Sequence, residues 1–214
     1  MKARSYPVVL SLACGLAAYA VMQAAESATP PYSFVNPDDP AVAEIRRLGQ
    51  RTIDQAGNAL LGEVRRVMAD TTPALAVGRL HLKDYKLPAT APGKPTVIEL
   101  RRTSLRVRNP ANSPDAADRA ALEHIQKQLE HGDPVDNVLV QRVTLPGMAP
   151  EWRVYRPLGT LKQCLDCHGR PEALAPGVAE TLQVFFPTDN AIDYQNGEWR
   201  GLIRVSLVES AKKP

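Results

Sequence analysis

Cysteine and aromatic residues are scarce in this chain of 214 residues, and neither sign of charge dominates. The three cysteines are too few for a dense disulfide framework. The 26 lysines and arginines nearly balance the 23 aspartates and glutamates, so a nucleic-acid partner held by phosphate neutralisation has little support. The sequence also lacks a triad-like grouping of Ser, His and Asp and a phosphate loop, so we expect no hydrolytic or nucleotide-dependent enzyme.

The N-terminus has the layout of a secretory leader. Two basic residues precede an apolar run from Pro7 to Met22, and small residues follow it. Because the run is nearly long enough to span a bilayer, an uncleaved anchor that tethers the protein to the membrane is the alternative. We therefore expect a periplasmic protein with a signal peptide or anchor over 1–25, a proline-rich linker without regular structure over 26–39, and one domain over 40–210.

Residues 164–168 read Cys-Leu-Asp-Cys-His, the CxxCH pattern of covalent haem c attachment. A zinc site needs further Cys or His ligands, and the sequence has no second pair at ligand spacing. A dithiol redox motif needs a thioredoxin-like strand and helix around it, whereas here the motif follows a strand that ends near residue 157. Haem needs only the pentapeptide, because Cys164 and Cys167 can each bind one vinyl group while neutral His168 meets the iron as proximal ligand. We expect the other ring nitrogen of His168 to donate to a backbone carbonyl or water. Since haem c is attached after export, the leader and the motif together predict one covalently bound haem c.

The sequence leaves the ligand on the opposite face of the iron open among five residues: His81, His124, His131, Met68 and Met148. His124 and His131 lie among the polar residues of a predicted helix. Met68 continues an apolar helix face, and Met148 lies in a proline-flanked loop. His81 lies in an apolar stretch and is the leading candidate, with an open or water-filled site as the alternative.

The apolar pattern predicts a mixed α and β domain. A long amphipathic helix is expected over 40–69, and a second helix is expected from a cap at Ser113 to His131, with Gly132 just beyond its end. Alternation and turn residues predict about five strands, over 97–107, 138–145, 152–155, 182–186 and 202–208. The second and third of these form a hairpin.

Three arginines fall on one face of the strand predicted over 97–107, since side chains alternate along a strand. They are Arg102, Arg106 and Arg108. One interpretation is a solvated face. The other is that Arg106 or Arg108 pairs with a haem propionate, because a guanidinium fork suits a carboxylate.

Four blocks of the sequence, 102–115, 155–158, 164–169 and 197–201, closely resemble one bacterial family in order and spacing. It is the family of PAS-like mono-haem c domains, and the resemblance extends over about residues 40–208. It implies an α+β fold, a PAS-like antiparallel sheet of about five strands flanked by helices with a long N-terminal helix, found alone or as the extracytoplasmic sensor of larger receptors. Tyr155, in the second block, is counted with Arg106 and Arg108 among the haem-binding residues.

The sequence departs from this family at one point. Relatives often carry a cysteine in the segment corresponding to 76–82, where it supplies a thiolate to the iron. This chain has no cysteine there, which excludes a Cys/His haem and makes a bis-histidine haem with His168 and His81 the leading alternative.

The chemistry is therefore expected to belong to the iron. The first hypothesis is a non-catalytic redox protein that passes one electron, or reports redox state, to a partner protein. The alternative is a sensor of NO, CO or O2 with an open or displaceable distal ligand, and a peroxidase-like enzyme ranks third. Because no kinase, methyl-accepting or cyclase module follows the last strand, we expect any sensory output to pass through a separate signalling partner.

Overall fold

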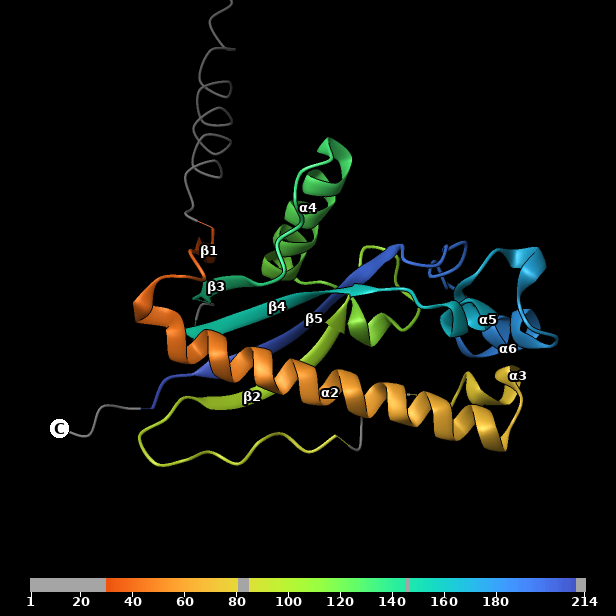
Figure 1. Ribbon diagram of the computed structural model, residues 1–214, viewed down its shortest axis with the longest axis horizontal. Coiled ribbons are helices and arrows are strands. Elements are labelled where there is room, and N and C mark those ends of the chain that lie inside the picture. The colour runs from red at the N-terminus through yellow and green to blue at the C-terminus, as the bar shows by residue number, and fades with distance from the viewer. Residues whose placement is uncertain (1–29, 81–84, 145–146, 211–214) are drawn as a thin grey trace, which may run out of the picture. The chain divides into compact units, whose positions relative to one another are not determined.

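The computed structural model describes residues 30–80, 85–144 and 147–210. Within this part of the chain, helices flank a five-stranded antiparallel sheet with strand order β1-β3-β4-β5-β2 (Figure 1). The strands are β1 (Tyr32–Val35), β2 (Thr96–Thr103), β3 (Leu139–Val143), β4 (Glu151–Gly159) and β5 (Trp199–Val208). The α-helices are α2 (Ala43–Asp70), α3 (Pro73–Ala76), α4 (Ala116–His131), α5 (Leu165–His168) and α6 (Val178–Phe185). The α+β class predicted from the sequence is confirmed.

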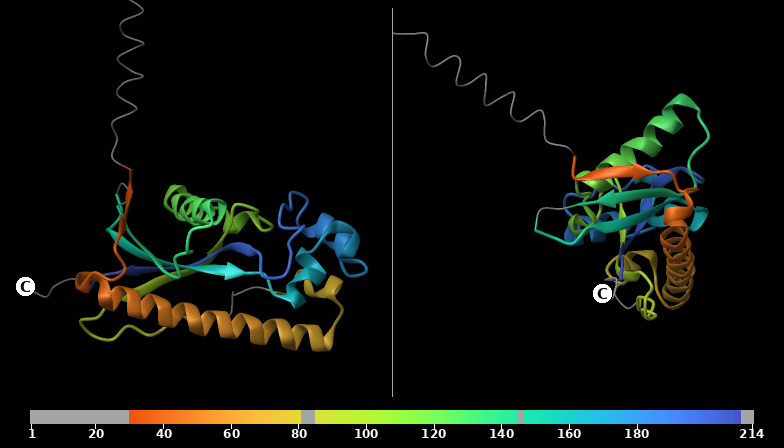
Figure 2. Two further views of the ribbon diagram at one scale, coloured as in Figure 1. Left: turned by 45° about the horizontal axis from the view of Figure 1, so that its top comes forward. Right: turned by 90° about the vertical axis from the view of Figure 1, so that its left-hand side faces the viewer.

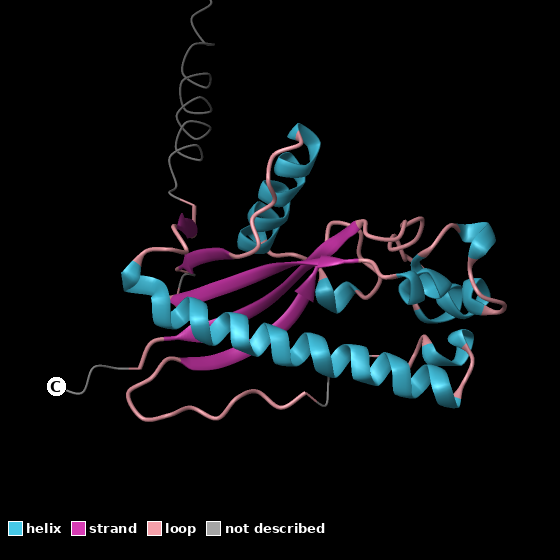
Figure 3. Cartoon of the chain, in the orientation of Figure 1, coloured by secondary structure: helices cyan, strands magenta, loops and turns pink. Residues whose placement is uncertain are grey.

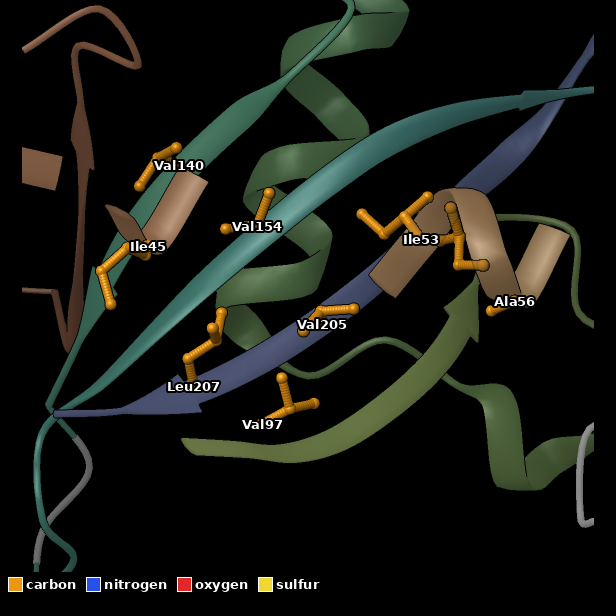
Figure 4. Close-up of a cluster of buried hydrophobic side chains, with 9 residues drawn as sticks. Ile45, Ile53, Ala56, Val97, Val140, Val154, Val205 and Leu207 are labelled. Atoms are coloured by element: carbon orange, nitrogen blue, oxygen red, sulfur yellow. The ribbon is translucent and has the colours of Figure 1, made fainter. Parts of the chain in front are cut away.

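The long helix α2 covers one face of the sheet. A short 3₁₀ turn over Pro40–Val42 leads into it, and Asp39 caps that turn by accepting a hydrogen bond from the Ala41 N–H at 2.8 Å. The buried residues Ile45, Ile53 and Ala56 of α2 pack against apolar side chains of β2, β3, β4 and β5 (Figure 4). This apolar stripe explains the predicted 40–69 helix, which the structure confirms.

The pleat of the sheet sends neighbouring residues to opposite faces. Val154 of β4 packs into the cluster beneath α2, whereas Tyr155 packs against Leu122 and Ile125 of α4 on the other face. The two helices lie on opposite sides of the sheet in both views of Figure 2. Among the described residues, no helix combines the length and apolar character that a bilayer crossing needs.

A glycine of α2 sets how closely the helix approaches the sheet. A Cβ at Gly49 would lie 2.6 Å from the Cβ of Val154, so alanine there forces helix and strand apart. We expect Gly49→Ala to lower the free energy of unfolding by about 1–3 kcal/mol in urea titrations. Gly57→Ala on the same helix is the control, because nothing lies within 4 Å of its Cβ position, and it should stabilise by about 0.5–1 kcal/mol. Equal effects at both positions would contradict the packing argument.

A buried ionic network joins α4 to the sheet. Asp118 of α4 is fully buried and accepts hydrogen bonds from Arg204 at 2.9 and 3.0 Å and from Arg153 at 3.3 Å. The Tyr155 hydroxyl lies 3.1 Å from Asp118 Oδ1 and 2.9 Å from Gln141 Oε1. Burial and the neighbouring Asp118 charge raise the pKa of Tyr155 well above its usual value, so the phenol stays protonated as a donor.

Two predictions for irregular or extended segments were wrong. The segment 182–186 was predicted as a strand, but residues 182–185 belong to helix α6 and Phe186 caps its end (Figure 3). Its apolar run is too short for periodicity to separate the two states, and the helix buries Val178 and Leu182 one turn apart. Within the segment predicted as an irregular linker, Tyr32–Val35 forms edge strand β1, which pairs with β3 from Tyr32↔Val143 to Val35↔Val140.

Other element bounds shift by a few residues. Strand β2 ends at Thr103, so Arg106 and Arg108 lie in the loop beyond it and not on the strand face predicted for them. Helix α4 is capped by Asp115, whose side chain accepts from the Asp118 N–H, and not by Ser113. Gly132 ends it in the left-handed conformation at φ +72°, as predicted.

Candidate functional site

The CxxCH motif forms one helical turn at the end of strand β4. A 3₁₀ turn over Lys162–Cys164 runs directly into α5, so Cys164 and Cys167, three residues apart, fall on the same face of the turn. Both are free, half-buried thiols. Helix α3 contacts α2, α5 and α6, and these elements gather at the end of the domain where the C-terminal half of α2 lies (Figure 1).

The His168 imidazole is oriented by a single backbone carbonyl. Its Nδ1 lies 2.7 Å from the carbonyl oxygen of Ala191, and because a carbonyl only accepts, Nδ1 carries the proton. Burial, followed by the charges of Arg108 and Arg200, lowers the pKa of His168 to about 3. The ring is therefore neutral near pH 7, and its Nε2 lone pair is free to coordinate a metal.

Arg108 ties the motif to two other segments. Its guanidinium donates to Asp189 Oδ2 at 3.0 Å, to the Ala191 carbonyl at 3.2 Å and to the carbonyl of Cys167. Asp189 in turn accepts from the Ala191 N–H at 2.7 Å. Arg108 thus fixes the Ala191 carbonyl, which orients His168, relative to the backbone of the motif.

Residues 189–194 form a loop that is bonded on both sides. The N–H groups of Asp193 and Tyr194 donate to the carbonyls of Gly169 and His168 at 2.7 and 2.9 Å, and the N–H of Asn190 donates to Val107 at 2.9 Å. Asp193 takes the left-handed φ of +62°, which is uncommon for a residue other than glycine. The loop therefore fixes α5 relative to the segment that follows β2.

A cluster of arginines surrounds Tyr194 beside the motif. The guanidinium groups of Arg106 and Arg200 lie 4.0 and 5.0 Å from the centroid of the Tyr194 ring, and the ring meets His168 edge-on at 6.3 Å. Arg106 also bonds Glu198 at 3.4 Å. Arg106 and Arg108 each contact a carboxylate of the chain itself, Glu198 and Asp189, so part of each guanidinium is already engaged.

Large apolar side chains are exposed at the same end of the domain. Leu75 of α3 is 61% exposed, and Val184 and Phe185 of α6 are 77% and 60% exposed. The Phe185 ring lies beside Gly78, just after α3, so the two elements present these side chains together. Together with two thiols and a neutral imidazole, this exposed apolar surface fits a large flat macrocycle that is joined through sulfur and coordinated through nitrogen.

The structure brings five of the seven predicted site residues together at the motif. Cys164, Cys167 and His168 share one turn, and Arg108 bonds to that turn directly. Arg106 joins them through Tyr194. Tyr155 is not brought to the motif, because it lies in the buried network beneath α4, and His81 lies outside the described residues.

The other candidate distal ligands have partners or locations of their own. His124 bonds Asp136 at 2.8 Å, and His131 lies exposed at the end of α4, 3.8 Å from Asp133. Met148 is 62% exposed between β3 and β4, and Met68 lies half-buried near the end of α2. Among the described residues, no group of three or more His, Cys, Asp or Glu side chains is placed to hold a metal ion.

The sequence analysis did not single out Asp189, Ala191, Tyr194 or Arg200. Arg200 lies in the block 197–201 that carries the family resemblance, and this was a signal that could have found it. Ala191 acts through its backbone carbonyl, Tyr194 through the face of its ring and Asp189 through a carboxylate. None of these contacts leaves a spacing pattern in the sequence.

The neutral state of His168 predicts a pH dependence of stability in protein that carries no cofactor. The unfolded chain takes up a proton near the usual pKa of 6.5, whereas the folded chain does so only near 3. Stability from this group is complete above pH 6.5 and is lost as the pH falls toward 3. Urea titrations of a Cys164→Ser/Cys167→Ser background should show that adding His168→Gln reduces the pH slope of the unfolding free energy by up to about one proton between pH 6 and 4. An unchanged slope would show that the imidazole is not held neutral.

Comparison with known proteins found a matching family model and a similar solved structure. The model of a family described as Tll0287-like matches residues 60–207. A solved structure described as "Crystal structure of the cyanobacterial heme-protein Tll0287" is 18% identical to the chain, with a TM-score of 0.49, and the match covers 84% of this chain and 100% of that one. No curated protein matches the chain.

Proposed function

The chain belongs to the Tll0287-like family, and from this premise we propose that it is an exported c-type mono-haem protein that transfers single electrons or reports redox state to a partner protein. The observation that carries the proposal is the state of His168. A neutral imidazole, oriented through Nδ1 by a fixed carbonyl, stands directly after two free thiols. An iron ligand of this kind needs that tautomer and that protonation state.

Attachment needs only the two thiols. Cys164 and Cys167 would each hold the haem through one thioether, the S–H adding across a vinyl C=C with no oxidant consumed. The turn places both sulfurs on one face, and the exposed side chains Leu75, Val184 and Phe185 supply an apolar surface nearby.

When bound, the haem supplies a one-electron Fe(III)/Fe(II) couple. The chain's own groups act on that couple through charge and orientation. His168 would donate through Nε2, and Arg108 holds Ala191 so that the ring does not turn. Arg106 and Arg200 lie over the Tyr194 ring and add positive charge beside the motif. Positive charge near the iron would disfavour the ferric state and raise the reduction potential.

Electron transfer to a partner requires an approach to the macrocycle. Cys164 and Cys167 are half-buried, so the groups joined to them lie near the protein surface. The partner, the periplasmic location and the tether through the N-terminal segment are parts of this proposal, and the segment 1–25 lies outside the described residues.

The experiment is expression with export and c-type maturation, followed by mass spectrometry under denaturing conditions and by optical and EPR spectra with and without carbon monoxide. We expect one covalent haem and low-spin ferrous bands that carbon monoxide does not shift, with His81→Ala removing the low-spin signature. A colourless product without added mass would refute the haem assignment. A prompt shift of the wild-type bands with carbon monoxide would replace the redox role with gas sensing.

A further inference from the structure

Arg102 lies on the sheet face that α2 covers, at the end of β2 nearest the motif. It pairs in register with Ile203, a member of the apolar cluster beneath α2, and Leu100, two residues earlier, packs against the same cluster. Side chains opposite each other in a strand pair share a face. Arg102 therefore extends the α2 side of the sheet toward the C-terminal half of that helix, where Glu63 acts on its charge.

A β-bulge brings a second guanidinium to this place. Leu158 pairs with Gly201 and Gly159 with Trp199, so Arg200 is the extra residue on β5. Trp199 and Leu202 both pack on the α4 face although they are three residues apart, which shows that the regular alternation is broken between them. The Arg200 guanidinium instead donates to Ser104 Oγ at 2.7 Å, two residues beyond Arg102.

Like charges crowd at this site. Burial and the charges of Arg200 and Arg108 lower the pKa of Arg102, and burial also lowers the pKa of Arg200. Arg108 has the carboxylate of Asp189, but no salt bridge joins Arg102 or Arg200 to a carboxylate in the described ranges. Three guanidiniums that are largely removed from water near the carboxylates of Asp189 and Glu63 keep an excess of positive charge, so the site favours a bound anion.

We propose that Arg102 and Arg200 bind a carboxylate of the cofactor, a haem propionate, and this rests on the proposed function. Arg200 lies 3.4 Å from the hydroxyl of Tyr194, whose ring meets His168 edge-on at 6.3 Å. Its bond to Ser104, two residues beyond Arg102, brings the end of β2 to the same place, so both guanidiniums lie on the side of the site where His168 stands. The role expected for Arg106 or Arg108 thus passes to the pair whose forks have no salt-bridge partner among the described residues.

The test compares haem-loaded and cofactor-free full-length protein, the latter carrying Cys164→Ser/Cys167→Ser. Arg102→Gln should lower the melting temperature of the loaded protein and shift its propionate bending band in resonance Raman spectra, yet leave the cofactor-free protein unchanged or stabilised. Arg102→Lys, which keeps a charge, should restore part of the loss. Arg101→Gln is the matched control, because Arg101 bonds the carbonyls of Ala111 and Ser113 and should destabilise both forms equally.

Two results would overturn the proposal. The first is equal destabilisation of loaded and cofactor-free protein by Arg102→Gln, which is the behaviour of a purely structural arginine. The second is a propionate band that does not move in Arg102→Gln, together with stabilisation of the cofactor-free protein by inorganic phosphate. If that stabilisation is lost without Arg102, the site binds a free anion. Failure of the haem assignment itself is seen earlier and separately, as a wild-type protein without added mass.

Discussion

Serine at both Cys164 and Cys167 should abolish covalent haem, because a hydroxyl does not supply the thiolate-like nucleophile that adds to a vinyl group. Each single variant should keep one thioether and leave one vinyl group unreacted. The pyridine haemochrome spectrum of the denatured protein distinguishes the three cases, and the mass shows whether any haem remains. Both thiols are half-buried and without a disulfide, so the fold should survive their replacement.

Asp166→Asn provides the control for these variants. Asp166 lies between the two cysteines in the same turn and is exposed, so its replacement tests the effect of any change within the motif. We expect normal haem content in this variant and unchanged circular dichroism in all of them. Haem that stays bound to the double serine variant after denaturation would contradict attachment through these two sulfurs.

Replacing Asp118 with alanine should cost about 3–5 kcal/mol of unfolding free energy, because it leaves two buried guanidiniums without their shared carboxylate. Asp118 is fully buried, and the side chains of Arg153 and Arg204 are 4% and 1% exposed. Neither arginine has another fully buried acid, since Asp115, Glu151 and Glu99 are partly exposed. The Tyr155 hydroxyl loses a partner as well.

Urea titration measures this loss. Asp118→Asn keeps the shape and part of the hydrogen bonding, so its cost should fall between that of alanine and zero. Asp133→Ala, on an exposed residue just beyond α4, should change stability by less than about 0.5 kcal/mol. A loss at Asp118 no larger than at Asp133 would show that the network does not hold α4 on the sheet.

The candidate site was predictable where its chemistry lies in adjacent residues. Cys164, Cys167 and His168 occupy one turn, so their spacing alone brings two thiols and an imidazole together. Helix α2 was equally predictable, because its apolar residues recur at helical spacing over 28 residues. Helix α6 was not, because eight residues with a short apolar run suit a strand as well as a helix until the neighbouring elements decide.

By itself, the sequence determined the CxxCH motif, the long helix that covers the sheet and the hairpin of β3 and β4. Only the tertiary structure decided that Tyr32–Val35 pairs as an edge strand, that the Ala191 carbonyl orients His168, and that a bulge turns Arg200 toward the end of β2. The physical reason is that local periodicity records which side of an element is apolar. It does not record which polar atoms from distant segments meet when those apolar sides are buried together.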